Sequence, residues 1–197
     1  RHRGAPVARV GDVVAVAARS LASAEEFAQL HGIARAYDGY AALLAAEDID
    51  LVYVALPPSE HVRWSVAALE SGKHVLCEKP FAMNAEQARY AASVAERTGL
   101  HLIEAFHDHY HPLMSELREV IESGVLGRIE SFEATFTASN PFSTTSIRHV
   151  PELGGGALMD LGCYPVHWLR KLGGAEPVVV DASYVPNDLG ADYAITA

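Results

Sequence analysis

An acidic and a basic side chain stand together at the end of a short apolar run. Residues 74–77, "HVLC", have the composition of a buried strand, and Glu78, Lys79 and Pro80 follow them directly. A lysine at a desolvated sheet edge is suited to hydrogen bonding or proton transfer, because burial disfavours its charged form and a neighbouring carboxylate restores it. Most proteins also carry several such pairs on surface loops, so this pair alone does not define a site.

Three histidines, His107, His109 and His111, alternate with other residues in "HDHYH". On an extended chain their side chains would face one side, with Asp108 on the other. Imidazole nitrogens are good zinc ligands, so this pattern keeps a metal-dependent hydrolase open as one function.

The first half of the chain alternates short apolar runs with helical patterns. Strands are predicted at 13–19, 50–58, 74–80 and 101–106, and helices at 23–33, 39–49, 59–73 and 84–99. In the first helix we predict Ser23 as the N-cap, Glu26 as its partner in a capping box, and Gly32 as the stop. Strands of about 4–8 residues that alternate with helices of about 10–15 residues are typical of βαβ units and a parallel sheet.

Polar residues follow three of these predicted strands. They are Arg19, the 56–61 loop, and the pair formed by Glu78 and Lys79. The carboxyl ends of parallel strands meet at one edge of the sheet, where open α/β sheets bind ligands. A dinucleotide-binding sheet also needs a glycine-rich turn after its first strand, and the sequence has no such turn, because the glycines at 154–156 follow a loop.

The pattern changes after about residue 106. An amphipathic helix is predicted at 110–127 and a glycine-initiated helix at 154–174, with alternating strands at 128–139, 176–185 and 192–197. A parallel half followed by a more open, antiparallel α+β half predicts two domains, 1–105 and 106–197.

Composition narrows the class of protein. The 197 residues include 15 basic and 25 acidic side chains, and the net charge of −10 argues against nucleic acid or an anionic membrane surface as a partner. No run approaches the ~18 apolar residues of a membrane span. Two cysteines, Cys77 and Cys163, cannot build a disulfide framework, which favours a reduced, cytoplasmic compartment. The chain begins with Arg1 and ends within a strand pattern, so we expect it to be a segment of a longer protein.

Four segments together resemble a known family. "VYVALPPSEH", "HVLCEKPF", "EAFHDHYHP" and "ELGGGALMDLGCYPVHWLR" have the order and spacing of the Gfo/Idh/MocA oxidoreductases, and look most like the branch of dihydrodiol and NADP-dependent D-xylose dehydrogenases. The resemblance covers essentially the whole chain. It implies a Rossmann-type, doubly wound parallel sheet at 1–105, with its first strand and glycine loop missing. It further implies an α+β domain at 106–197 with an open, mostly antiparallel sheet used for homo-oligomerisation, as a dimer or tetramer.

The resemblance assigns catalytic roles. Lys79 matches the lysine of the family's Glu-Lys-Pro motif, near nicotinamide and substrate, and Pro80 matches a cis proline. Tyr164 stands where many relatives carry histidine, and the look-alike branch has tyrosine there as general acid/base. Asp160 and Lys79 would tune Tyr164.

The local pattern around Tyr164 bears on that role. On a continuous helix Asp160 and Tyr164, four residues apart, would reach one pocket, although Pro165 would kink this helix or begin its main part. A phenol has a pKa of about 10, and we expect Lys79 to lower it. A tyrosine packed in a helix core fits the same pattern.

The resemblance also assigns binding roles. Arg19 stands where an acidic residue would bind the 2′-hydroxyl of NAD, so it favours the 2′-phosphate of NADP, with NAD as the second choice. Leu56, Pro57 and His61 match the loop that wraps the cofactor, mostly through its backbone. The pair of Glu78 and Lys79 is expected to face the nicotinamide.

For the substrate pocket the resemblance points to His109, Arg148 and Tyr164. The family has a stretch similar to 107–111 that ends in His-Pro and holds no metal, and it often has arginine where His109 stands. We therefore favour a pocket or interdomain role for this segment over a metal site.

The sequence thus predicts an NADP-preferring oxidoreductase that transfers a hydride between nicotinamide and a hydroxyl-bearing carbon of a sugar, polyol or cyclic diol. Two alternatives from other classes stay open. One is a non-catalytic, cofactor-sensing regulator on the same fold, and the other is the metal-dependent hydrolase.

Overall fold

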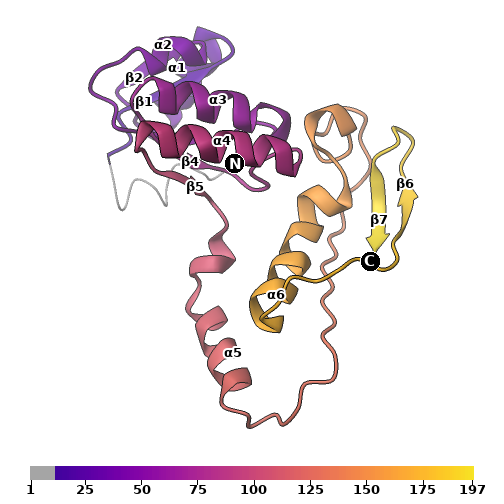
Figure 1. The fold of residues 1–197 in the computed structure, drawn as a ribbon. Helices are drawn as coiled ribbons and strands as arrows, with labels where there is room; N and C mark the ends of the chain where they lie inside the picture. Colours follow the sequence, from indigo (N-terminus) through magenta and orange to yellow (C-terminus); the bar gives the residue numbers. More distant parts are fainter. Residues whose placement is uncertain (1–11) are drawn as a thin grey trace. The chain divides into compact units, whose positions relative to one another are not determined.

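The computed structural model describes residues 12–197 (Figure 1). Contacts divide the chain into two compact units whose residues interleave along the sequence. Of the described residues, the first holds 12–54 together with Arg63–Leu76 and Tyr90–Leu102. The second holds Ala55–Val62, Cys77–Arg89 and Ile103–Ala197.

The first unit begins with two strand–helix pairs. Strand β1 (Ala15–Ala18) pairs in parallel with β2 (Arg35–Asp38), and the helices are α1 (Leu21–His31) and α2 (Tyr40–Leu44). Strand β2 was not predicted, because "RAYD" has neither an apolar run nor a clear alternation.

The cap of α1 differs from the prediction. Ser20, not Ser23, is the N-cap, and its hydroxyl accepts the backbone N–H of Ser23 at 3.3 Å. Both serines are spaced to cap a helix, and the chain uses the earlier one, which adds a turn. The predicted stop is confirmed, since Gly32 is left-handed with φ of 67°.

The predicted alternation continues as β3 (Leu51–Val54), α3 (Pro58–Glu70), β4 (His74–Cys77), α4 (Ala85–Thr98) and β5 (Leu102–Glu104). The three strands form one parallel sheet in the order β3-β4-β5. Within residues 12–197 this sheet and the β1–β2 pair share no ladder. Leu69 on α3, Val75 on β4 and Val94 on α4 are almost fully buried.

The second unit continues after β5. It contains a 3₁₀ turn η2 (His107–Tyr110), α5 (Pro112–Glu122), a 3₁₀ turn η3 (Pro151–Leu153), a π-helical turn η4 (Leu158–Gly162), α6 (Cys163–Gly173), β6 (Ser183–Pro186) and β7 (Asp192–Thr196). Strands β6 and β7 form an antiparallel pair, as Figure 1 shows, with a register shift between Val185 and Pro186. No helix in the described part of the chain is long and apolar enough to cross a membrane.

Two strand predictions in the second unit are wrong over most of their length. Residues 128–139 have no regular secondary structure, and of 176–185 only the part from Ser183 joins a strand. An alternating pattern describes how side chains would face on a strand, but a strand also needs a backbone partner. Residues 128–139 and 176–182 have no ladder partner among residues 12–197, and Val178 and Val180 are 83% and 94% exposed.

Lys73 is a buried cation in the first unit and gives a test of its packing. It is 4% exposed, and its Nζ donates to the carbonyl oxygens of Ala46 and Ile49 at 2.6 and 2.9 Å. We expect Lys73→Met to lower the free energy of unfolding by about 1–3 kcal/mol, because a buried carbonyl of Ile49 and a part-buried carbonyl of Ala46 lose their donor.

Denaturant unfolding measures this loss, with Arg97→Met as the matched control. Arg97 forms an ion pair with Glu70, and both side chains are more than half exposed. Its removal should change stability by no more than about 0.5 kcal/mol. Equal effects of the two substitutions would contradict a structural role for the Lys73 hydrogen bonds.

Candidate active site

The bend that follows β4 carries Lys79 and is held from two sides. The Lys79–Pro80 peptide bond is cis, which confirms the prediction for Pro80. His61 lies 2.8 Å from the Pro80 carbonyl oxygen through Nδ1, and Glu104 at the end of β5 accepts the backbone N–H of Phe81 at 2.9 Å. The strand therefore ends in a fixed turn, and Lys79 leaves the chain in a defined direction.

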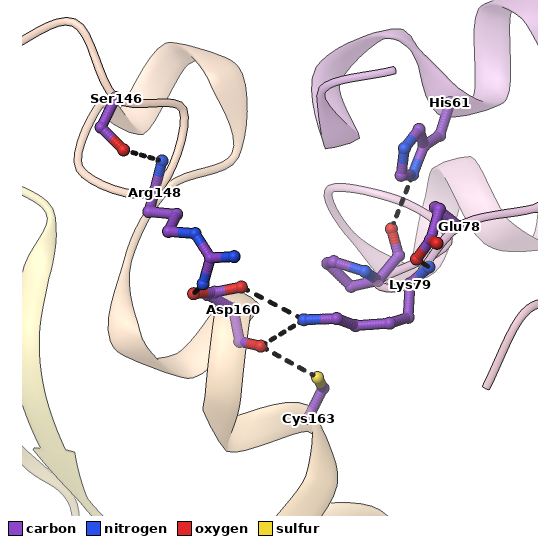
Figure 2. Close-up of polar contacts among 8 residues, drawn as sticks. His61, Glu78, Lys79, Ser146, Arg148, Asp160 and Cys163 are labelled. Carbon is purple, nitrogen blue, oxygen red and sulfur yellow. Dashed lines mark hydrogen bonds and ion pairs between the residues drawn. The ribbon is translucent and has the colours of Figure 1, made fainter. Parts of the chain in front are cut away.

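The lysine pairs with a different acid from the one predicted. Its Nζ lies 3.2 Å from Oδ1 of Asp160 and also donates to the Asp160 backbone carbonyl, as Figure 2 shows. Glu78 instead accepts the backbone N–H of Lys79 at 3.2 Å. Adjacent residues on an extended chain point to opposite sides, so sequence neighbours are poorly placed to pair through their side chains.

Asp160 lies between two cations (Figure 2). Its Oδ1 faces Lys79, and its Oδ2 accepts a hydrogen bond from Nη1 of Arg148 at 2.6 Å. The Lys79 and Asp160 side chains are 16% and 21% exposed, whereas that of Arg148 is 44% exposed. Lys79, Asp160 and Arg148 thus form one charged cluster. The sequence had assigned Lys79 and Asp160 to catalysis and Arg148 to substrate binding.

Tyr164 adjoins this cluster inside a group of aromatic rings. It is 7% exposed, and its ring centroid lies 5.1 Å from the Lys79 Nζ. The rings of Phe106 and Phe136 lie 5.0 and 5.2 Å away. The lysine therefore lies over the tyrosine ring, in the geometry of a cation–π contact.

The prediction that Lys79 lowers the pKa of Tyr164 is wrong. Burial, first of all, raises this pKa to about 12, and the neighbouring Cys163 thiol and the acidic groups of Asp108, Glu78 and Asp160 act in the same direction. The charge of Lys79 is balanced by Asp160, to which it is hydrogen-bonded. The phenol accordingly keeps its proton across the neutral range.

The helix between Asp160 and Tyr164 is not a continuous α-helix. Asp160 belongs to the π-helical turn η4, and Tyr164 to the first turn of α6. Pro165 follows Tyr164 and has no N–H to continue the ladder, so it stands at the beginning of the main helix, one of the two predicted outcomes. Both side chains nevertheless contact Lys79 in spite of the changed helix, and their sharing of one pocket stays a prediction.

The residues expected to bind a cofactor lie in different places. Arg19 is exposed directly after β1 in the first unit. In the second unit Leu56 and Pro57 are half-buried before α3, and their carbonyl oxygens contact His61 Nε2 at 2.7 Å and the N–H of Glu60 at 2.9 Å. His61 itself is 1% exposed.

The histidine segment is not extended, so its three side chains do not line one side. Residues 107–110 form the 3₁₀ turn η2, and His111 caps α5 by accepting the N–H of Leu113 at 3.1 Å. His109 is exposed, with its Nδ1 3.4 Å from Lys171 Nζ. Within residues 12–197 no group of three or more His, Cys, Asp or Glu side chains is placed to hold a metal ion.

Two carboxylates of the second unit were missed by the sequence reasoning. Glu104 supports the bend, and burial raises its pKa, an effect offset in part by the Phe81 N–H and by electrostatic interaction with His61 and Lys79. Asp108 accepts the indole N–H of Trp168 at 2.9 Å. A sign of Glu104 was present in "HLIEAF", where an acid ends a predicted buried strand at the same edge as Lys79.

A cavity of about 520 Å³ in the second unit lies apart from these groups. It is lined by α5, by α6 and by residues 132–135, and Asp108 and Trp168 contribute to its wall. Lys79, Asp160 and Tyr164 do not line it, so it is not the candidate active site.

Comparison with known proteins gives matches along nearly the whole chain. Residues 2–106 match the Gfo/Idh/MocA oxidoreductase family with its NAD-binding Rossmann fold, and residues 114–195 match the C-terminal domain of that family. A trans-1,2-dihydrobenzene-1,2-diol dehydrogenase of Xenopus laevis is 38% identical over 185 residues, which are 93% of this chain and 56% of that protein. An NADP-dependent D-xylose 1-dehydrogenase of Haloferax volcanii is 37% identical over 181 residues, 92% and 55% of the two chains. The chain therefore spans about half the length of the curated relatives it matches.

A solved structure has a similar fold. A 3-ketoreductase from Actinomadura kijaniata in complex with NADP and TDP-benzene has a TM-score of 0.78 and 38% identity, over 88% of this chain and 51% of that one. Other structures of that enzyme carry phenylalanine in place of one tyrosine, or alanine or glutamate in place of one lysine.

The protonation of Tyr164 can be measured directly. We expect its phenol to ionise near pH 12, because burial and nearby acidic groups raise its pKa from 10. The unfolded phenol has the lower pKa, so its contribution to stability is fully present below about pH 10 and is lost as the pH rises towards 12. NMR of tyrosine labelled with ¹³C at Cζ follows the ionisation, and the resonance absent from Tyr164→Phe identifies it. Ionisation at or below pH 10 would contradict the buried, acid-surrounded environment.

Proposed function

Because the chain belongs to the Gfo/Idh/MocA family of oxidoreductases, we propose that the whole protein is an NADP-preferring dehydrogenase or reductase. It transfers a hydride between nicotinamide and a hydroxyl-bearing carbon of a sugar, polyol or cyclic diol. The observation that carries this proposal is the cluster in which Asp160 pairs with Lys79 and Lys79 lies over the ring of Tyr164.

The named relatives support the substrate class and the cofactor. They act, by name, on a cyclic diol and on D-xylose, and the ketoreductase structure holds NADP with a TDP-linked molecule. In the ketoreductase variants the substituted lysine and tyrosine are separated by almost the same number of residues as Lys79 and Tyr164. The two residues altered in that enzyme therefore correspond in type and spacing to the centre of this cluster.

Tyr164 and Lys79 have complementary tasks in this reaction. A phenol whose pKa is about 12 stays protonated at neutral pH, and such a group can donate a proton to the oxygen of a carbonyl as it becomes an alkoxide. Lys79 stays close enough to the ring to stabilise negative charge that develops beside it. Asp160 forms an ion pair with Lys79 and a second one with Arg148. We further propose that His109 and Arg148 contact the substrate.

Residues of several segments are of the types that would contact a dinucleotide, although the glycine-rich turn that such a sheet needs is not in this sequence. When bound, the nicotinamide would supply the hydride. Arg19 is an exposed cation at the carboxyl end of β1, suited to the 2′-phosphate of NADP, and Leu56 and Pro57 present backbone at the carboxyl end of β3. Glu78 and Lys79 occupy the equivalent end of β4.

The proposal also covers the setting of the enzyme. We place it in the cytoplasm, as a homo-oligomer that associates through the sheet of its C-terminal domain, with the boundary between the two domains near residue 105. The few cysteines support the compartment, and the division of the family matches at 106 and 114 supports the boundary.

Lys79→Met and Tyr164→Phe test the mechanism in the full-length protein. Each should lower kcat by about 100- to 10,000-fold with NADP and a panel of sugars, polyols and cyclic diols, because a proton donor or its partner is lost. Arg97→Met, which removes an exposed cation of the first unit, is the matched control and should leave kcat unchanged. Rates near wild type in both variants would show that Lys79 and Tyr164 take no part in the reaction. An unaltered protein that binds NADP but turns over no substrate would favour the regulator.

Arg19→Ala tests the choice of cofactor. A charge-assisted contact to the 2′-phosphate contributes about 1.5–3 kcal/mol, so the KM for NADP should rise about 10- to 100-fold. The KM for NAD, which has no such phosphate, should change by less than about twofold on the same argument. Equal changes in the KM for NADP and for NAD would show that Arg19 does not bind the 2′-phosphate.

A further inference from the structure

His61 is surrounded by hydrogen-bond acceptors on both edges of its ring. It lies in the first turns of α3 and is 1% exposed. Its Nδ1 is 2.8 Å from the carbonyl oxygen of Pro80, and its Nε2 is 2.7 Å from that of Leu56. Figure 2 shows the first of these contacts beside Lys79.

These two contacts restrict the protonation state of the ring. A carbonyl oxygen only accepts hydrogen bonds, and a neutral imidazole donates from one nitrogen only. In either neutral tautomer one nitrogen lone pair would face a carbonyl oxygen at less than 3 Å, which is repulsive. The imidazolium form donates from both nitrogens and satisfies both carbonyls.

We propose that His61 is held as an imidazolium in the folded protein and ties Leu56 to Pro80, which makes it a positioning residue for Lys79. The two carbonyls belong to the segment before α3 and to the bend after β4, so one side chain fixes the spacing of both. Both ring nitrogens are engaged by the protein, so His61 acts on a bound cofactor through the segments it holds and not by direct contact.

A buried cation requires nearby negative charge, and the second unit supplies it. The carboxylate of Glu104 on β5 interacts favourably with both His61 and Lys79. The same carboxylate accepts the N–H of Phe81, so Glu104 and His61 hold consecutive residues of one bend. The other charged groups on the bend are Glu78, which accepts the Lys79 N–H, and Lys79, whose charge is balanced by Asp160.

The position of the bend matters because Pro80 directly follows Lys79. Displacement of the Pro80 carbonyl would shift the Lys79 main chain and, with it, the contacts of Nζ to Asp160 and to the Tyr164 ring. The expected effect of these His61 contacts on kcat rests on the proposed function, whereas the protonation state of His61 does not.

The first experiment measures that protonation state in the unaltered full-length protein. With ¹⁵N-labelled histidine at pH 7.5, we expect the His61 ring to show a proton on each nitrogen, protected from exchange with water. Assignment comes from correlation to the His61 backbone and from loss of the signals in His61→Gln. A ring with one protonated and one bare nitrogen would overturn the proposal, whatever the activity of the enzyme.

The second experiment is a double-mutant cycle on kcat. A glutamine amide donates from a single nitrogen, whereas the two carbonyls lie at two different nitrogens of the ring, so His61→Gln should lower kcat at least about tenfold through misplacement of Lys79. The Kd for NADP should stay within about threefold of wild type on the same argument. In a Lys79→Ala background the same substitution should lower kcat by less than about twofold, because the group it positions is gone. His31→Gln, an exposed histidine of α1, is the matched control.

The outcomes separate the two proposals. A large rise in the Kd for NADP with unchanged kcat, or an equal loss of kcat in both backgrounds, would overturn the positioning role. If Lys79→Ala alone keeps the wild-type rate, the proposed function fails, and the NMR result still decides whether His61 is an imidazolium.

Discussion

The ion pair between Lys79 and Asp160 is the interaction on which the rest of the candidate site depends. It joins the bend after β4 to the π-helical turn before α6, across 81 residues of sequence. Both charges are largely withdrawn from solvent, so removal of Asp160 would leave Lys79 poorly compensated, whereas Asp160 without Lys79 would keep its ion pair with Arg148. The arrangement around them follows from this constraint, since Arg148 takes the second oxygen of Asp160, and Glu104 balances the positive charge on the side of the bend.

The same constraint determines the state of Tyr164. Asp160 neutralises Lys79, so the lysine cannot draw the proton from the phenol, although it lies over the ring. Burial among aromatic rings and the nearby acidic groups then raise the pKa of the phenol. A tyrosine in this state is a proton donor at neutral pH, which suits reduction of a carbonyl more directly than abstraction of a proton from an alcohol.

The strand–helix alternation, the cis bond at Pro80 and the gathering of Lys79, Asp160 and Tyr164 could all be predicted, because they follow from periodicity or from motifs in register. Side-chain partners could not. Lys79 pairs with Asp160 and not with Glu78, because neighbours on an extended chain point apart. The sequence places Glu104 at the same sheet edge as Lys79, but its contact with the Phe81 N–H depends on how β5 lies beside β4. The strand predicted at 128–139 failed for the same reason, because a partner far along the chain could not be predicted. An alternating pattern indicates which side chains would share a face, but not which strand would pair with the segment.

Lys73 and His61 are buried side chains of the described residues that each contact two backbone carbonyls, and the comparison shows what sets His61 apart. Lys73 binds the carbonyls of Ala46 and Ile49, which secures the end of α2 and has no chemistry nearby. A carbonyl-bound cation is therefore not in itself a sign of function. One of the carbonyls held by His61, however, belongs to Pro80, the residue after Lys79, so any movement of this ring is transmitted to the group that carries the proposed reaction. From the place of the acceptor in the chain, more than from the burial of the ring, we infer that His61 belongs to the candidate active site.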